Sequence, residues 1–190
     1  MDGFTKPGYD ARRHFISELA LGEHGWVQRA NFIVVGLLVI AFAAGLRDFF
    51  PIGRASRFGP PLIAIFGLGL VTSGAFTTDP ANYPAKTDVT STAGAIHDVA
   101  FLVILVAIIT ACFVFARRFR QEPTWRGYSL YSVMTGILVP GLLVVLVQTD
   151  PAFTGLAQRA LVAVFFLWIE VIALRALTLA IRTPQPEMAT

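Results

Sequence analysis

Charge and cysteine are both scarce in this chain. Only 14% of its 190 residues are charged, whereas 55% are hydrophobic, and a soluble domain usually carries about 25% charged residues. The single cysteine, Cys112, excludes an intrachain disulfide. This composition argues against a soluble domain, and the sequence has no long polar loop that could form one.

Motifs that identify a reaction are also missing. The sequence has no P-loop, no GxGxxG turn, no cysteine pairs at metal-ligand spacing, no HExxH segment and no GxSxG elbow. It lacks the basic and aromatic patch that is typical of nucleic-acid binding. The net charge of +3 comes from arginines beside apolar segments, where they set topology and contact lipid headgroups. We therefore expect membrane lipids and no nucleic acid as partners, and the sequence identifies no cofactor.

What the chain does have is five long apolar stretches. They cover residues 30–46, 59–77, 95–116, 128–148 and 155–181. A helix needs roughly 20 mostly apolar residues to cross a bilayer. The pattern predicts an all-α integral membrane protein, a bundle of five transmembrane helices. Residues 30–182 are predicted to form a single transmembrane domain, and residues 183–190 a tail.

The segment before the first stretch mixes apolar and charged side chains. Residues 8–29 include Trp26, and tryptophan suits the headgroup region of a membrane. The pattern predicts a short helix lying at the membrane interface, which Gly22 and Gly25 are expected to end. Residues 1–29 are therefore assigned to an interfacial segment.

Positive charge alternates from one gap between the apolar stretches to the next. The first gap, the third gap and the C-terminal tail carry the arginines Arg47, Arg54, Arg57, Arg117, Arg118, Arg120, Arg126 and Arg182. The second gap has only Lys86, and the fourth, residues 149–154, has no positive residue. By the positive-inside rule, the arginine-bearing side is cytoplasmic. We predict a multi-pass protein of the cell (cytoplasmic) membrane, with an extracytoplasmic N-terminal segment and a cytoplasmic C-terminus.

This orientation places several basic residues outside the cell with no upstream helix to carry them across. They are Lys6, Arg12, Arg13 and Arg29. Either a preceding helix exists in relatives, or the first helix inserts as a reverse anchor. The first explanation is favoured because residues 8–26 resemble a linker that follows another element.

Polar residues gather on the extracytoplasmic side of the predicted bundle. Ionisable groups at membrane depth are costly and mark candidate sites. The pattern predicts a polar pocket that opens to the extracytoplasmic leaflet and binds or handles a lipid, with the candidate residues His14, Ser17, Glu18, Asn31, Asp79, His97, Asp98 and Arg159. Arg159 is expected to pair with a carboxylate from Asp79, Asp98 or Asp150, or else to extend towards lipid headgroups.

Other functions stay open at this point. His97 could act with Asp98, Asp79 or Glu18 in a membrane-embedded hydrolase or transferase, with Ser17 as a nucleophile or with zinc. The usual zinc spacings are missing, so no metal ligand is assigned.

Glu170 stands apart from these residues, near the middle of the last stretch. We expect a carboxyl group that is hydrogen-bonded inside the bundle. In the alternative interpretation it serves a proton path in a small transporter or complex subunit, which would form homo-oligomers or bind a membrane partner.

The ordered motifs resemble a known family. They are GYDARRHFISELALGEHGWVQRANF, then FGLGLVTSGAFTTDP, a YP pair and GAIHDVAFLV. Together they resemble the bacterial and archaeal family called domain of unknown function 998. The resemblance implies six spans, one of them before the GYD segment, and it assigns no residue a role. More distantly, the ISEL segment is similar to the Frag/DRAM/Sfk-like six-span proteins connected with lipid metabolism.

Overall fold

The computed structural model describes residues 8–50, 54–80 and 90–182, and these contain helices and no strand. Their elements in chain order are η1 (Ile16–Ala20), α2 (Gly25–Phe49), α3 (Arg54–Ala75), α4 (Thr92–Gln121), η2 (Pro123–Trp125), α5 (Arg126–Gln148) and α6 (Thr154–Arg182). The prediction of an all-helical fold is confirmed. The predicted tail, residues 183–190, lies outside the described residues.

Five of these helices, α2 to α6, are long and apolar enough to cross a membrane. They indicate a multi-pass membrane protein, and the predicted number of long apolar helices is confirmed for the described residues. Several helices run past the apolar stretches: α2 begins at Gly25, and α4 continues to Gln121. The reason is that a helix is held by local backbone hydrogen bonds, which do not stop where apolar side chains stop.

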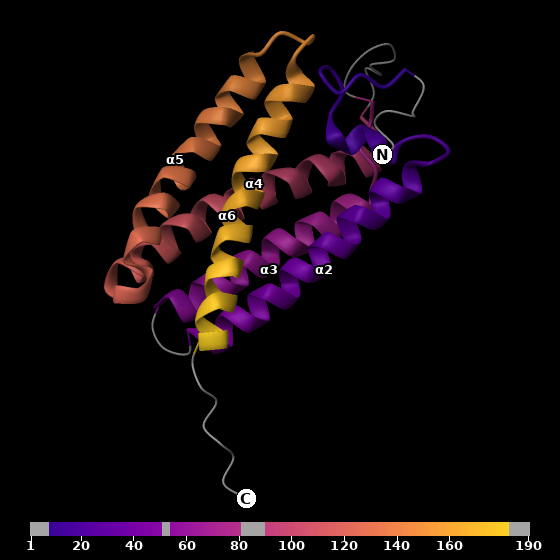
Figure 1. Cartoon of the computed structure of the whole chain (residues 1–190). Helices are drawn as coiled ribbons and strands as arrows, with labels where there is room; N and C mark the ends of the chain where they lie inside the picture. Colours follow the sequence, from indigo (N-terminus) through magenta and orange to yellow (C-terminus); the bar gives the residue numbers. More distant parts are fainter. Residues whose placement is uncertain (1–7, 51–53, 81–89, 183–190) are drawn as a thin grey trace, which may run out of the picture.

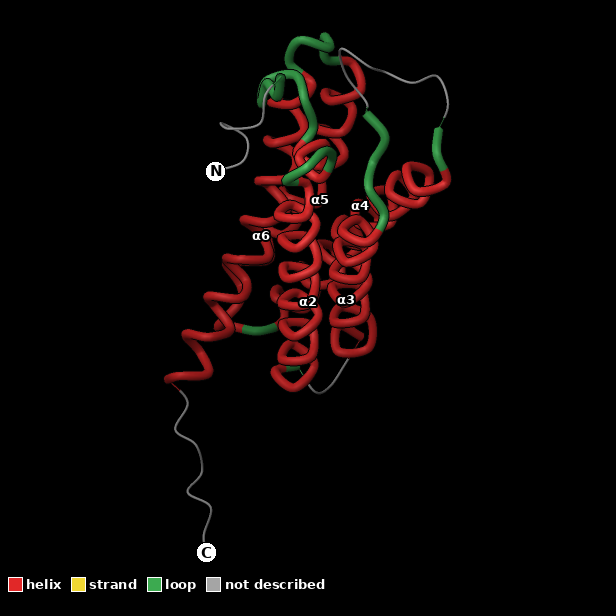
Figure 2. Tube along the Cα trace, turned by 90° about the vertical axis from the view of Figure 1, so that its right-hand side faces the viewer, coloured by secondary structure: helices red, strands yellow, loops and turns green. Residues whose placement is uncertain are grey.

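The helices pack in chain order. The pairs α2 and α3, α3 and α4, α4 and α5, and α5 and α6 are each in contact. Figure 1 shows α2, α3 and α4 running alongside one another, with the α5–α6 hairpin crossing them. In the turned view of Figure 2, the C-terminal end of α6 lies away from α2. Helix α6 is therefore an outer element that packs mainly on α5.

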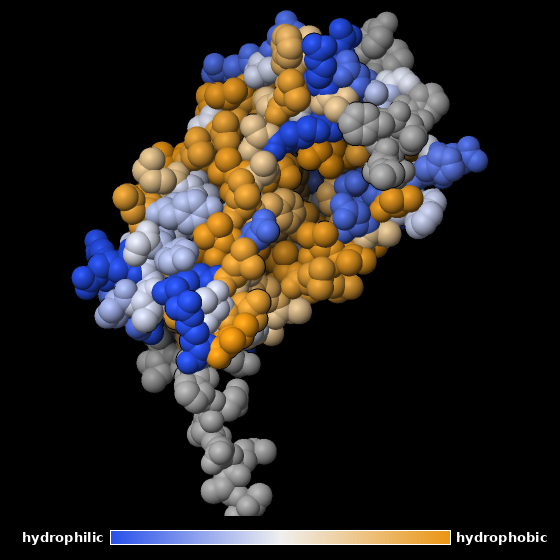
Figure 3. All heavy atoms as spheres, viewed as in Figure 1, coloured by the Kyte–Doolittle hydropathy of each residue, from blue (hydrophilic) through white to orange (hydrophobic). Residues whose placement is uncertain are grey.

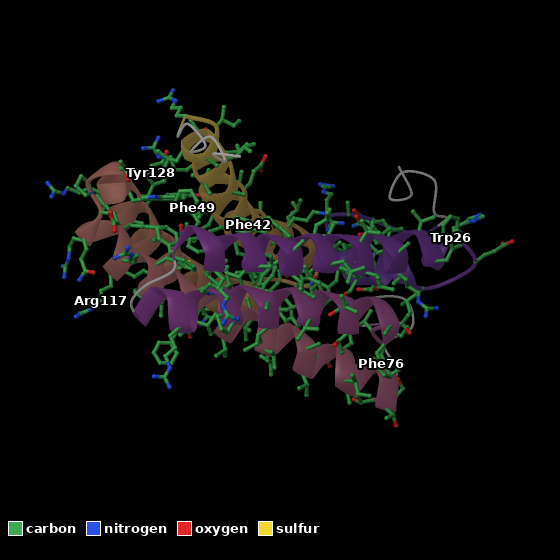
Figure 4. The ribbon with its side chains drawn as sticks, turned by 90° about the horizontal axis from the view of Figure 1, so that it is seen from below. Trp26, Phe42, Phe49, Phe76, Arg117 and Tyr128 are labelled. Carbon is green, nitrogen blue, oxygen red and sulfur yellow. The ribbon has the colours of Figure 1, made fainter. Side chains whose placement is uncertain are left out.

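One end of the bundle has a dense aromatic core. The ring of Trp125 stacks on Phe119 at 4.6 Å between centroids and meets Phe50 at 5.5 Å. Figure 4 shows Phe49, Arg117 and Tyr128 towards this end, while Trp26 and Phe76 lie at the other. Arg117, one of the arginines of the predicted cytoplasmic side, thus lies at the end of the molecule opposite Trp26. Figure 3 shows the broad apolar band between two hydrophilic ends.

The segment before α2 is less helical than predicted. Only η1 is helical, and it is a 3-10 helix of five residues. Gly22, with φ of 80°, forms the turn that follows it, whereas Gly25 begins α2 instead of ending the preceding segment. Ser17, Glu18 and Ala20 are buried, so η1 packs onto the helices. Its position at a membrane interface stays a prediction.

Candidate functional site

Arg159 fastens the N-terminal segment to the first turns of α6. Its Nη1 atom donates to the carbonyl oxygens of Ala11 at 2.6 Å, His14 at 2.9 Å and Gly155 at 2.9 Å. Its Nη2 atom donates to the Tyr9 hydroxyl, which in turn donates to the Phe15 carbonyl at 3.1 Å. Within the described residues, no carboxylate pairs with Arg159. The expected ion pair is therefore wrong: three backbone carbonyls provide the negative ends of dipoles instead.

Tyr9 shares this environment. Burial raises the pKa of its hydroxyl, and the hydrogen bond and charge of Arg159 oppose that rise. The ring also stacks on His14, with 5.4 Å between centroids. Tyr9 and His14 therefore belong to the packing of the N-terminal segment.

Three neighbours of Arg159 complete the attachment. The Ile16 amide donates to Oε1 of Gln158 at 2.7 Å, and the Thr154 hydroxyl donates to the Arg13 carbonyl at 2.9 Å. A Cβ atom on Gly155 would lie 2.5 Å from the His14 carbonyl oxygen. Glycine is thus required where the segment crosses α6, and the segment forms a lid over this end of the bundle.

Asp79 organises the start of α4. Its carboxylate accepts hydrogen bonds from the Ser91 amide at 2.8 Å and the Ser91 hydroxyl at 2.7 Å. The same hydroxyl accepts from the Gly94 amide, which makes Ser91 the N-cap of the helix. A carboxylate beside a helix N-terminus is also favoured by the helix dipole. This arrangement fixes the position of His97, one turn further along.

His97 is buried between α2, α3 and α4. Its Nδ1 atom lies 2.9 Å from the Phe76 carbonyl oxygen, and its ring meets the edge of Phe32 at 6.3 Å between centroids. Since a carbonyl oxygen only accepts, Nδ1 carries the proton in the neutral imidazole, and Nε2 is then the acceptor. No carboxylate of the described residues bonds His97, so the expected Asp partner is not found.

Below the N-terminal segment lies a cavity of about 370 Å³. Its apolar wall includes Phe32, Leu70, Phe101, Ile104, Val162 and Phe165. Its polar lining includes Ser17, Ser73, Asp79, His97, Asp98 and Gln158. The lining comes from every long helix and from the N-terminal segment, so the cavity exists only in the assembled bundle. Its volume falls in the range of small-molecule sites, about 300–1,000 Å³.

Several of these polar groups are free to bind a ligand. Ser17 and Ser73 are buried residues, and their hydroxyls have no hydrogen-bond partner among the described residues. Gln158 uses its oxygen for Ile16, which leaves its amide NH₂ as a donor. The described lining contains two aspartates and no lysine or arginine. The site therefore offers hydrogen bonds and negative charge, and it offers no cation to a phosphate.

The structure brings together half of the predicted site. Ser17, Asp79, His97 and Asp98 line the cavity. His14, Glu18, Asn31 and Arg159 do not: His14 and Glu18 are buried within the N-terminal segment, Asn31 is exposed on α2, and Arg159 faces carbonyl groups. No group of three His, Cys, Asp or Glu residues within the described ranges is placed to hold a metal ion.

Glu170 is not hydrogen-bonded inside the bundle. It is exposed on α6 and has no hydrogen bond or ion pair with any described residue. The prediction of a satisfied internal carboxyl is wrong, because that face of α6 has no helix packed against it.

Sequence reasoning missed Ser73 and Gln158. Ser73 is not among the candidate residues above, and Gln158 directly precedes the more conspicuous Arg159. A usable signal existed, since both are polar residues inside apolar stretches. Periodicity could not show which of them faced a cavity.

A family model described as "Protein of unknown function (DUF998)" matches residues 1–175 of the chain. No curated protein and no solved structure matches the chain.

Proposed function

The chain belongs to the DUF998 family, whose activity is unknown, and we propose that it binds a lipid-like amphiphile in the cavity under the N-terminal segment. One observation carries the proposal: the cavity is lined by both polar and apolar side chains and lies between helices long enough to span a bilayer. Such a lining suits a molecule with a polar head and a hydrocarbon body. Ligand sites are typically apolar with a few placed polar groups.

The polar lining favours an uncharged or cationic head. Hydroxyl groups of a ligand can donate to Nε2 of His97 and to the carboxylate of Asp98, and can accept from Ser17, Ser73 and Gln158. A phosphate would meet two aspartates and no lysine or arginine in the described lining. Burying an anion without a cation costs several kcal/mol. We therefore infer a hydroxyl-bearing head instead of an anionic one.

The size of the cavity favours one hydrocarbon chain. At about 370 Å³ it lies near the lower limit for ligand sites, and a diacyl lipid would have to leave one chain outside. By the positive-inside rule, we expect this end of the bundle to face the extracytoplasmic side. The proposed ligand thus enters from the outer leaflet.

Binding of three single-chain probes tests the proposal. Purified protein in nanodiscs is titrated with monooleoylglycerol, lysophosphatidate and oleylamine. Monooleoylglycerol and oleylamine should each bind more tightly than lysophosphatidate. Ser73→Phe should abolish binding by filling the cavity, and His97→Leu should weaken it by roughly 2- to 12-fold, the value of one hydrogen bond.

Val106→Phe is the matched control, since Val106 is 65% exposed on α4 and does not line the cavity. Tighter binding of lysophosphatidate would overturn the assignment of the head. Binding unchanged by Ser73→Phe would overturn the site itself.

Ester hydrolysis is a second candidate, and one feature of His97 favours it. The Nδ1 hydrogen bond to Phe76 leaves Nε2 as a base, and Ser17 and Ser73 line the same cavity. A histidine base beside a hydroxyl is the arrangement that activates serine. Release of oleate from monooleoylglycerol, lost in His97→Gln, would establish hydrolysis. Binding without release would leave a binding protein.

A further inference from the structure

Glu170 occupies an unusual place in the molecule. It lies two residues from the midpoint of α6, Thr154–Arg182, which is about 3 Å along the helix axis. Its side chain is exposed and has no hydrogen bond or ion pair with any described residue. In a bilayer it would face hydrocarbon, where a carboxyl group without a partner is costly. A hydrogen-bond partner from another molecule would remove this cost.

Glu170 is part of a continuous exposed stripe along α6. The stripe, which we call the α6 stripe, consists of Leu156, Ala160, Ala163, Leu167, Glu170, Leu174, Leu177 and Ile181, all exposed. The steps between them alternate between four and three residues, the spacing of helix pairs that cross at about 20°. Glu170 is the only polar member. Ala160 and Ala163 are small enough to allow close approach of a second helix.

We propose that the α6 stripe packs against the same stripe of a second copy of this chain, with the two Glu170 carboxyl groups hydrogen-bonded to each other. Two copies inserted in the same direction are related by a twofold axis normal to the membrane. That symmetry places equal residues at equal depth. A carboxylic acid group carries both a donor and acceptors, so two of them facing each other satisfy both.

The other charges of α6 do not offer a better partner. Arg159 is held by the N-terminal segment. The Nη2 atom of Arg175 donates to the Thr124 carbonyl at 2.6 Å, and its guanidinium lies 5.5 Å from the Tyr128 ring centroid. Both arginines are thus engaged within their own chain, and the third, Arg182, lies about 18 Å further along the helix axis than Glu170. The hydrogen-bond partner at the same depth as Glu170 is therefore Glu170 of the second copy.

The position of α6 allows this contact. It packs mainly on α5, and its C-terminal end lies away from α2 (Figure 2). Glu170 does not line the cavity described above. The proposal is therefore independent of the proposed function, and each can fail without the other.

Disulfide crosslinking tests the geometry. Cys112 is fully buried, and Cys112→Ala provides a background without cysteine. In that background, Leu167→Cys and Leu174→Cys should give a crosslinked dimer in proteoliposomes on oxidation. Val106→Cys, 65% exposed on α4, should not. Equal crosslinking at Val106, or none at either α6 position, would overturn the proposal.

The role of the carboxyl group is tested by two substitutions. Glu170→Gln keeps a donor and an acceptor and should retain the dimer. Glu170→Leu should raise the dimer dissociation constant roughly 3- to 30-fold, the range for one hydrogen bond between helices. Energy transfer between labelled copies at increasing protein density measures both. A wild-type chain that stays monomeric at every density would overturn the proposal, and so would one that associates only with a different protein. An unchanged dimer dissociation constant in Glu170→Leu would show that Glu170 does not contribute to the contact.

Discussion

At the scale of single residues, the guanidinium of Arg159 donates hydrogen bonds to several backbone carbonyls at once. It bonds the carbonyls of Ala11, His14 and Gly155, so the N-terminal segment depends on it for attachment to α6. We predict that Arg159→Gln weakens that attachment by about 1.5–3 kcal/mol, the value of a charge-assisted hydrogen bond. Hydrogen exchange of the amides of residues 9–16 should rise roughly 10- to 150-fold.

Arg159→Lys should recover only part of the protection, because an ammonium group cannot reproduce the planar fork of arginine. Arg182→Gln, at the exposed far end of the same helix, serves as the control and should leave exchange unchanged. Equal exchange in Arg159→Gln and the native chain would show that the segment is held by its other contacts.

The sequence allowed us to predict how far along the membrane axis each site residue lies. It did not allow us to predict in which direction around its helix each side chain points. Ser17, Asp79, His97 and Asp98 were identified because apolar stretches locate which polar groups share one end of the bundle. Asn31 has the same depth but points outward. Whether a side chain points inward or outward depends on which neighbouring helices pack against its own helix. An apolar sequence carries little of that information, because lipid-facing and buried positions are both apolar.

At the scale of elements, the contact between α2 and α3 depends on two glycines. A Cβ atom on Gly36 would lie 2.6 Å from the Gly67 carbonyl oxygen, and one on Gly67 would lie 2.7 Å from that of Gly36. The two backbones touch without side chains between them. We predict that Gly67→Ala destabilises the protein by about 1–3 kcal/mol through overpacking. Unfolding in mixed micelles by added sodium dodecyl sulfate measures this.

Gly45 supplies a matched control in the same pair of helices. Nothing lies within 4 Å of a Cβ atom added there, so Gly45→Ala should stabilise the helix by up to about 1 kcal/mol. Loss of stability in both variants would mean that α2 packs differently.

Some small residues lie at a contact between helices and others lie on an exposed face, and the sequence does not distinguish the two. Ala41 and Gly45 are four residues apart, and so are Gly69 and Ser73. The first pair is exposed, whereas a Cβ atom on Gly69 would lie 2.5 Å from Ile104 of α4. The same spacing thus occurs at a helix contact and on a free face. The five helices themselves were predictable because length and hydropathy alone define them.

At the scale of the whole molecule, the two ends differ in charge and in construction. The end that carries the cavity is closed by the N-terminal segment, while Arg117 lies at the other (Figure 4), with Arg118, Arg120 and Arg126 close to it in the chain. Arginines near the ends of transmembrane helices stay on the cytoplasmic side during insertion. The cavity end should therefore face outward, where the proposed ligand would come from the outer leaflet.

Cysteine labelling measures that orientation directly. In the Cys112→Ala background, Glu23→Cys and Asp150→Cys place exposed thiols at the cavity end, and Arg120→Cys places one at the arginine end. A membrane-impermeant maleimide added to intact cells should label the first two and leave the third unlabelled until the cells are opened. The reverse labelling pattern would mean that the bundle has the opposite orientation, with the cavity at the inner leaflet. Labelling of all three in intact cells would mean that chains insert in both directions, in which case the arginines do not set the topology.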